Sequence, residues 1–181
     1  MNKNVCLALI CVSTAVLAVG QEAKQPTPAE GYTVHVTAPH VVNGQVMGPF
    51  HHYCKVHSPD PVIVCLIYDS AEPNARLSQV EYIIAKKITR ANVSLKEWNR
   101  NWHDHRLEIA TGRVQVHDLP ENKAKEVADL VATTDGLIFS LWPAGATVPP
   151  GKAVNAQSVG HKPITAAEFK SGAKDVAEGS K

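Results

Sequence analysis

The chain lacks an excess of charge of either sign: its 181 residues carry 18 Lys and Arg against 17 Asp and Glu. A balanced chain offers no basic stripe for a phosphate backbone, so nucleic acid is not an expected partner. Cysteine is also scarce, because four residues are too few for the disulfide framework of a very small secreted domain. What remains is an ordinary globular composition, 44% hydrophobic and 19% charged, which excludes collagen-like, coiled-coil and wholly disordered classes.

The sequence also has little that resembles a membrane span. Its longest uncharged apolar run, residues 5–19, follows Lys3 and is succeeded by Gly20. A spanning helix needs about 20 apolar residues, whereas a positive residue, a shorter apolar run and small residues at its end are typical of a secretory signal peptide. We therefore expect residues 1–20 to be cleaved near Gly20 and residues 21–30 to be a linker. The mature protein is then exported, periplasmic or secreted, without a transmembrane anchor.

Cleavage at that position changes the composition of the working protein. It removes Cys6 and Cys11, so that Cys54 and Cys65 are the cysteines that remain. It also removes Lys3, which accounts for the formal net charge of +1. A neutral exported chain strengthens the case against anionic partners, and an oxidising compartment permits a disulfide between the two remaining cysteines.

The spacing of apolar residues predicts strands over most of the chain. Residues 50–56 and 62–68 alternate and are separated by a Ser-Pro-Asp-Pro sequence, which predicts a β-hairpin. Residues 103–110 alternate as well and are predicted to form a half-buried strand. Further strands are expected at 32–36, 77–85 and 137–142.

Helices and loops are predicted from capping and turn residues. Ser94 and Glu97 fit a capping box at the start of one short helix. Asp118 is expected to cap a second helix, with Pro120 in its first turn. An Asp-Gly turn is expected at 135–136, and a Pro- and Gly-rich loop at 143–163.

Strands outnumber helices and do not alternate regularly with them, so the expected fold class is α+β. We expect a single domain over residues 31–165, built from a mainly antiparallel sheet with two or more short helices. A polar C-terminal tail is expected at 166–181.

The predicted hairpin brings its two cysteines together. A turn centred between residues 59 and 60 places Cys54 opposite Cys65, and His52 opposite Ile67, on a mostly apolar face. A cross-strand disulfide, two buried thiols that act as small hydrophobic groups, and a thiolate metal site with His52 all fit this position. The first two interpretations are favoured equally, and the third is the weakest.

Histidine is the residue type with the most chemistry in this sequence, with nine copies. On the predicted strand 103–110, His103 and His105 share a face and can both reach one ion. His52, or His51 if the hairpin faces are exchanged, adds a third nitrogen. Three imidazoles with an open position suit Zn or another divalent transition metal. The alternative, that these are hydrogen-bonded core histidines, stays open because His-x-His alone is a weak signal.

The remaining histidines are expected elsewhere. His161 lies in the predicted loop, from which it can reach such a cluster. Surface or turn positions are expected for His35, His40, His57 and His117.

Several segments, in this order, are similar to one known family. They are Gly-Pro-Phe-His-His-Tyr-Cys-Lys at 48–55, Cys-Leu-Ile-Tyr-Asp at 65–69, Pro-Asn-Ala-Arg-Leu at 73–77, Val-Glu-Tyr-Ile-Ile at 80–84, Trp-His-Asp-His at 102–105 and Val-Gly-His-Lys-Pro at 159–163. Together they resemble the oil-body-associated protein family of plants, which has relatives in fungi and bacteria. The resemblance implies a shared domain over residues 31–165, whose function in the family is unknown and which brings no catalytic residues with it.

The resemblance bears on location and on the cysteines. Plant members are intracellular, so an exported relative shares their domain but not their oil-body location. Because those intracellular relatives carry the same two cysteines, the resemblance in part favours buried thiols at Cys54 and Cys65.

Two functions follow from the sequence. The first is a binding or accessory module for an apolar or lipid ligand, indicated by the family's association with lipid bodies and by the lack of a recognisable catalytic set. The alternative is a metal-dependent enzyme, hydrolase-like, built on His103, His105 and His51 or His52.

Overall fold

The computed structural model describes residues 27–58, 60–142 and 146–174. The predicted signal peptide, residues 1–20, and most of the predicted linker therefore lie outside the described residues. The chain divides into two units, Met1–Glu30 and Gly31–Lys181, and the fold given below is that of the second unit. Within the described ranges, no helix combines the length and the apolar character needed to cross a membrane.

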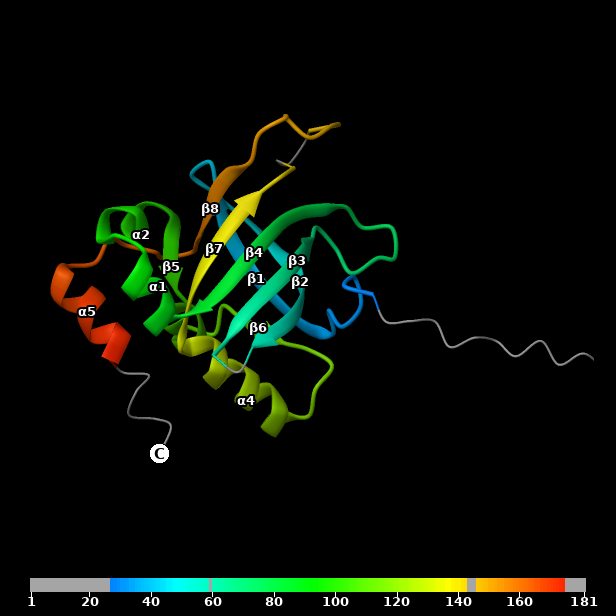
Figure 1. Ribbon diagram of the computed structural model, residues 1–181. Helices are drawn as coiled ribbons and strands as arrows, with labels where there is room; N and C mark the ends of the chain where they lie inside the picture. The colour runs from blue at the N-terminus through cyan, green and yellow to red at the C-terminus, as the bar shows by residue number, and fades with distance from the viewer. Residues whose placement is uncertain (1–26, 59, 143–145, 175–181) are drawn as a thin grey trace, which may run out of the picture. The chain divides into compact units, whose positions relative to one another are not determined.

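Six antiparallel strands close into a barrel (Figure 1). They are β1 (Val34–Val42), β2 (Gln45–Ser58), β3 (Val62–Tyr68), β4 (Leu77–Ala85), β7 (Thr134–Ser140) and β8 (Val154–Ser158). The strand order is β2-β3-β4-β7-β8-β1, and the additional pairing of β1 with β2 closes the circle. Two short strands, β5 (Trp102–Asp104) and β6 (Gln115–Val116), pair with β7 and β1. The prediction of a mainly antiparallel α+β domain is confirmed, and closure into a barrel makes it more specific.

Five helices complete the described fold. They are α1 (Lys86–Asn92), α2 (Leu95–Asn101), α3 (His105–Ala110), α4 (Glu121–Ala132) and α5 (Ala166–Lys174). Helix α2 begins where it was predicted, because the Ser94 hydroxyl accepts the Glu97 N–H at 3.2 Å. Helix α5 occupies a segment that was expected to be a polar tail. Its Phe169 is buried and packs edge-on against Trp98, so this segment belongs to the fold.

The hairpin has the predicted register, with Cys54 opposite Cys65 and His52 opposite Ile67. Its inward face contributes most of one apolar cluster in the barrel interior. The buried members are Val36, Phe50, Cys54, Ile63, Cys65, Ile67 and Ile83. Side chains that alternate inward along each strand fill the interior of a small barrel, so any polar group among them is buried.

The strand predicted at residues 103–110 is wrong beyond its first two residues. Strand β5 ends at Asp104, whose carboxylate accepts the N–H of Arg106 at 2.8 Å and caps helix α3. His105 and Glu108 are three residues apart and therefore share one helix face. Residues two apart do not share a helix face, so the alternation that indicated a strand does not describe this segment, and Leu107 is exposed.

Three other local predictions are also wrong. Asp118 does not cap helix α4: its φ is 60°, its carboxylate pairs with His35, and Pro120 holds the cap position. Asp135 and Gly136 lie inside strand β7 instead of in a turn. The loop predicted at 143–163 contains strand β8.

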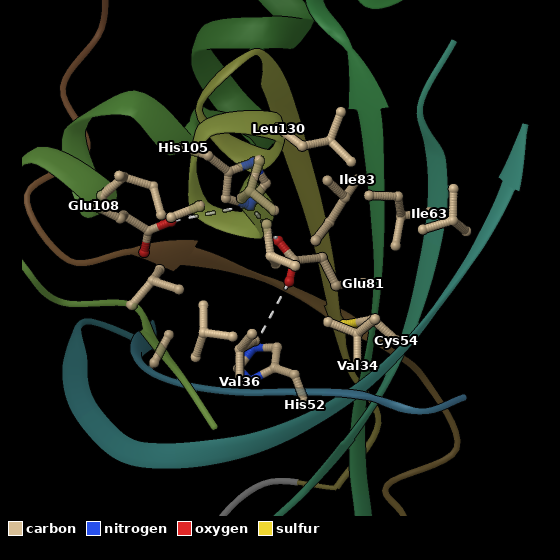
Figure 2. Close-up of a pocket in the computed structure, with 18 of the residues that line it drawn as sticks. Val34, Val36, His52, Cys54, Ile63, Glu81, Ile83, His105, Glu108 and Leu130 are labelled. Atoms are coloured by element: carbon tan, nitrogen blue, oxygen red, sulfur yellow. Dashed lines mark hydrogen bonds and ion pairs between the residues drawn. The ribbon is translucent and has the colours of Figure 1, made fainter. Parts of the chain in front are cut away.

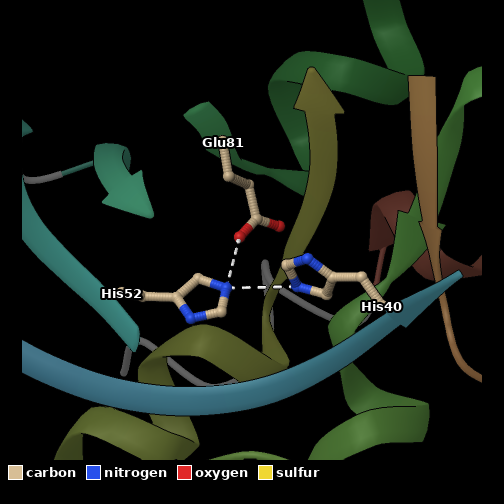
Figure 3. Close-up of side chains that lie close together, drawn as sticks. All are labelled: His40, His52 and Glu81. Atoms are coloured by element: carbon tan, nitrogen blue, oxygen red, sulfur yellow. Dashed lines mark hydrogen bonds and ion pairs between the residues drawn. The ribbon is translucent and has the colours of Figure 1, made fainter. Parts of the chain in front are cut away.

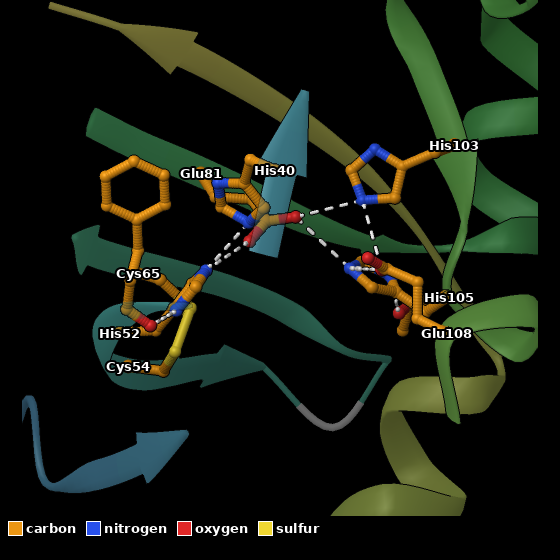
Figure 4. The surroundings of a disulfide bond; sticks show 10 residues. His40, His52, Cys54, Cys65, Glu81, His103, His105 and Glu108 are labelled. Atoms are coloured by element: carbon orange, nitrogen blue, oxygen red, sulfur yellow. Dashed lines mark hydrogen bonds and ion pairs between the residues drawn. A yellow bond between two sulfur atoms is a disulfide. The ribbon is translucent and has the colours of Figure 1, made fainter. Parts of the chain in front are cut away.

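Cys54 and Cys65 are joined by a disulfide, with an S–S distance of 2.00 Å and a Cα–Cα distance of 4.0 Å. The bond lies inside the barrel beside His52 (Figure 4). Both cysteines are buried, so the bond is shielded from exchange with external thiols.

The double variant Cys54→Ala/Cys65→Ala is expected to lower the free energy of unfolding by about 2–3 kcal/mol. The bond joins residues 11 apart in sequence, and closing such a loop restricts the unfolded chain by about that amount. Free thiols, titrated in denaturant in a Cys6→Ser/Cys11→Ser background, are expected to rise by two on reduction. Equal thiol counts with and without reductant would instead show that the pair is reduced.

Candidate metal centre

Four histidines and two glutamates converge inside the barrel (Figure 4). They are His40 from β1, His52 from β2, Glu81 from β4, His103 from β5, and His105 and Glu108 from α3. Each of the six is at most 3% exposed. Buried charged groups are stable only when paired or when they coordinate metals, so this cluster is the strongest candidate for a functional site.

Glu81 lies at the middle of the cluster. Its Oε1 is 3.1 Å from His105 Nε2 and 3.2 Å from His103 Nε2. Its Oε2 faces the opposite side, 3.7 Å from His52 Nε2. His52 Nε2 is in turn 3.1 Å from His40 Nε2 (Figure 3). The two carboxylate oxygens therefore serve two different pairs of imidazoles.

Glu108 adds a second carboxylate on one side only. Its Oε2 lies 3.7 Å from His103 Nε2 and 4.0 Å from His105 Nε2. The side formed by His103 and His105 thus has two carboxylates, whereas the side formed by His40 and His52 has Glu81 alone among the described residues.

A glycine makes room for this arrangement. Gly136 on β7 lies opposite His103 on β5, and a Cβ atom there would be 2.5 Å from Glu81 Oε1 and would also overlap the His103 ring. Its backbone conformation is extended, so the requirement for glycine is steric. The space that a side chain would fill at Gly136 is the space in which His103 meets Glu81.

The protonation of His52 and His105 is set by fixed acceptors. His52 Nδ1 donates to the Phe50 carbonyl at 3.1 Å. His105 Nδ1 donates to Thr134 Oγ1 at 2.9 Å, because that hydroxyl gives its own hydrogen to the Val131 carbonyl. In a neutral ring, Nε2 then carries a free lone pair that faces the centre. Metal-binding histidines are oriented in this way, with the other ring nitrogen donating to a carbonyl or similar acceptor.

His40 and His103 complete the set. His40 Nδ1 donates to Gln79 Oε1 at 2.5 Å, so its Nε2 also faces the centre as a lone pair. His103 Nδ1 is buried without a partner among the described residues, while its Nε2 faces Glu81. All four imidazoles present the same ring nitrogen to the interior.

Burial and neighbouring charges shift the pKa values in this cluster. Burial, helped by the charge of neighbouring His52, lowers the pKa of His40 to about 3, and burial also lowers the pKa of His52. Burial opposes ionisation of Glu81, but hydrogen bonds from His103 and His105 hold its pKa well below the usual range. Without a metal, therefore, a carboxylate anion at Glu81 lies between neutral imidazoles on one side and donor imidazoles on the other.

On that donor side, burial works against a charged His105, yet the hydrogen bond and charge of Glu81 raise its pKa. Burial raises the pKa of Glu108. The hydrogen bond between His105 Nε2 and Glu81 Oε1 lies where a metal ion would bind.

The structure brings together three of the four histidines proposed from sequence. His52, His103 and His105 belong to the cluster, whereas His51 points to the other face of β2, with its Nδ1 3.1 Å from His35 Nε2. His161 does not join them, because its ring lies against Trp98.

Sequence reasoning missed His40, Glu81 and Glu108. His40 was expected at the surface, but β1 continues to Val42, and alternation along the strand places His40 on the same inward face as Val36 and Ala38. Glu81 could have been identified from the sequence, because it is an acidic residue that shares the inward face of a predicted strand with Ile83. A strand over residues 103–110 would place Glu108 on the face opposite His103 and His105, so the strand prediction excluded it from the cluster.

An apolar cavity of about 60 Å³ adjoins the cluster (Figure 2). Its polar wall includes His40, His52, Glu81, His105 and Glu108. Aliphatic side chains such as Val36, Ile63, Ile83 and Leu130 form the remainder. A water molecule needs about 10–15 Å³ by this measure, so the cavity has room for a few waters or a group of similar size next to the site.

Comparison with known proteins identifies the family of this chain. Residues 26–175 match the family model described as "Protein of unknown function (DUF1264)". The chain is 34% identical over 92 residues to oil body-associated protein 1B of Arabidopsis thaliana, covering 51% of this chain and 37% of that protein. It is 35% identical over 104 residues to oil body-associated protein 2B of Zea mays, covering 56% and 40%.

A longer match, 26% identical over 135 residues, is to oil body-associated protein 2C of Arabidopsis thaliana and covers 72% of this chain and 55% of that protein. The chain spans only part of the length of these curated relatives. No solved structure matches it. The relatives bear the name that the sequence segments indicated. Because the family model covers most of the chain, the chain belongs to the DUF1264 family and is similar to plant oil body-associated proteins.

Proposed function

We propose that the protein binds a divalent transition-metal ion inside its barrel, through Glu81, His103 and His105, with Glu108 as a further ligand. The observation that carries this is the convergence of ligand atoms from β4, β5 and α3 within 4.8 Å of one another in a buried site. Ligands bound at about 2.0–2.1 Å around a tetrahedral ion lie roughly 3.4 Å apart. The separations of 3.1 and 3.2 Å from Glu81 Oε1 to the two imidazoles are close to that value.

The ligand types define the class of ion. Two imidazoles with one or two carboxylates suit Zn, Fe or Co, whereas Mg and Ca prefer ligand sets made of oxygen alone. Because the disulfide occupies both described cysteines, thiolate ligands are not part of the proposal.

The cavity supports a small occupant next to the ion. An ion with an open position activates a bound water, which is the chemistry of a metal-dependent hydrolase. The aliphatic wall and the names of the oil body-associated relatives support an apolar ligand instead. A cavity of about 60 Å³ is well below the 300 Å³ or so of ordinary ligand pockets, so a lipid ligand would bind outside it or open it.

Export after cleavage near Gly20 remains part of the proposal. The charge and length of the N-terminal apolar run support it. The disulfide between Cys54 and Cys65 adds support, because such bonds persist mainly in oxidising compartments.

Metal analysis of the full chain tests the proposed function. We expect bound Zn²⁺ after incubation and desalting, and an increase in unfolding free energy of about 2.7 kcal/mol at a free-ion concentration a hundred times the Kd. The double variant His103→Ala/His105→Ala is expected to lose that ion and that increase. His51→Ala is the matched control, because His51 neighbours His52 but faces outward. Wild-type protein without metal, or a double variant that binds as well as wild type, would contradict the proposal.

A further inference from the structure

We infer that the barrel holds a second metal ion, ligated by His40 and His52, so that Glu81 bridges two ions with one oxygen on each. This inference rests on the proposed function for the first ion and adds a second site. Its ligand atoms come from β1, β2 and β4 and lie within 4.8 Å of one another.

The orientation of Glu81 is the first argument. Its Oε1 faces His103 and His105, and its Oε2 faces His52 on the opposite side (Figure 4). A carboxylate that served a single ion would not need a second, separate pair of imidazoles behind it. Two-metal sites place their ions about 3.5–4 Å apart, a span that one bridging carboxylate can cover.

The contact between His40 and His52 is the second argument. Their Nε2 atoms are 3.1 Å apart, and in each ring Nδ1 already donates its hydrogen, to Gln79 Oε1 and to the Phe50 carbonyl. Two neutral rings held in this way direct lone pairs at each other and at a carboxylate, with no hydrogen between them. The lone pairs and the carboxylate repel one another, and a cation bound between them removes that repulsion.

The distance between the two rings also fits an ion. Two ligands bound at about 2.1 Å lie roughly 3.0 Å apart at a right angle and 3.4 Å apart in a tetrahedron. The observed 3.1 Å between the Nε2 atoms falls in this interval. The competing arrangement reverses the Gln79 amide, so that His40 Nε2–H donates to His52 in an ordinary buried pair and only one ion binds.

The two ions would differ in their surroundings. The ion beside His103 and His105 has Glu108 within reach, whereas the ion beside His40 and His52 has Glu81 as its one carboxylate among the described residues. Both sites border the apolar cavity, through His40 and His52 on one side and His105 and Glu108 on the other, but the second site has fewer protein ligands. The second ion therefore has the more open coordination sphere, and its remaining positions fit water-sized ligands.

Cobalt stoichiometry and spin coupling test the inference. Full-length protein, stripped by a chelator and reloaded with Co²⁺, is expected to bind two ions per chain, with a weakened electron paramagnetic resonance signal because the bridged ions couple. His40→Ala is expected to bind one ion and to recover the signal of an isolated ion, while His51→Ala keeps two coupled ions. His40→Gln retains a polar group at this position. It is also expected to bind one ion, so that the ion lost in His40→Ala is not explained by a folding defect.

The outcomes separate this inference from the proposed function. No bound ion in wild-type protein overturns both. One ion that is unaffected by His40→Ala overturns the second site and leaves the first. Two ions without coupling overturn the bridge by Glu81, and two coupled ions that survive His40→Ala overturn the assignment of its ligands.

Discussion

Replacing Arg90 with methionine is expected to lower the free energy of unfolding by about 3–5 kcal/mol, the usual cost of breaking a buried ion pair by removing one partner. The side chain of Arg90 is 2% exposed and that of Asp135 is 0% exposed. Nε and Nη2 of Arg90 donate to the two oxygens of Asp135 at 3.1 and 2.9 Å. Methionine preserves most of the packing volume but leaves the Asp135 carboxylate buried without its counter-charge.

Arg90 also joins segments that are distant in sequence. Its Nη2 donates to Asp104 at 2.9 Å, and its Nη1 donates to the carbonyls of Glu168 and Phe169 in helix α5. Asp104 lies between His103 and His105 and caps the helix that carries His105. The Arg90 network therefore supports both helix α5 and the segment that carries two of the proposed metal ligands.

Urea unfolding of matched variants measures this effect. Lys125→Ala removes an exposed pair with Asp129 and is expected to cost less than about 0.5 kcal/mol. Arg90→Met/Asp135→Asn is expected to be more stable than Arg90→Met, because it no longer buries an unpaired charge. A loss below about 1 kcal/mol in Arg90→Met would show that Asp135 finds another partner or water.

The parts of the fold that sequence predicted are those governed by local signals. Alternation on both sides of a Ser-Pro-Asp-Pro turn determined the hairpin and its register, including Cys54 opposite Cys65. β-Forming residues at 77–85 predicted β4 with its observed ends. Each of these signals lies within about ten residues of the element that it specifies.

The local predictions that proved wrong were overridden by distant contacts or by a second local signal. Asp-Gly at 135–136 has strong turn chemistry, yet Asp135 is buried in a strand because Arg90 neutralises it from helix α1. Residues 103–110 alternate like a strand, but capping by Asp104 starts a helix at His105. The partner of Asp135 cannot be obtained from a short window, whereas the Asp104 cap lies within one and competes there with the alternation.

For the same reason, sequence identified only three of the six residues that converge in the candidate metal centre, His52, His103 and His105. His103 and His105 were chosen because they are close in sequence, and His52 because of the hairpin face. His40 and Glu81 reach the same point only because β1 pairs with β2 and β4 pairs with β7 as the barrel closes. Closure is a property of the whole sheet, so a search by residue spacing cannot locate ligands that it brings together.

Gly136→Ala is expected to abolish binding of both ions and to cost about 3 kcal/mol of stability, the upper part of the usual range for overpacking. The added methyl would lie where the His103 ring and Glu81 Oε1 meet. Neither neighbour can yield without loss, because Glu81 is held by His105 and His103 is carried on a strand paired with β7. Displacing Glu81 removes the one carboxylate that the two proposed sites share.

A matched glycine and a compensating variant make this result specific. Gly151 lies in the loop before β8 and has a φ of 80°, so Gly151→Ala is expected to reduce stability through backbone strain without changing Co²⁺ stoichiometry. Gly136→Ala/His103→Ala is expected to regain part of the lost stability, because the smaller side chain restores the space, but not the ion bound by His103. If Gly136→Ala instead retained two ions per chain, His103 and Glu81 could not be ligands in the positions that the structure gives them. Metal analysis and urea unfolding of the three variants together therefore separate the steric role of Gly136 from a general loss of stability.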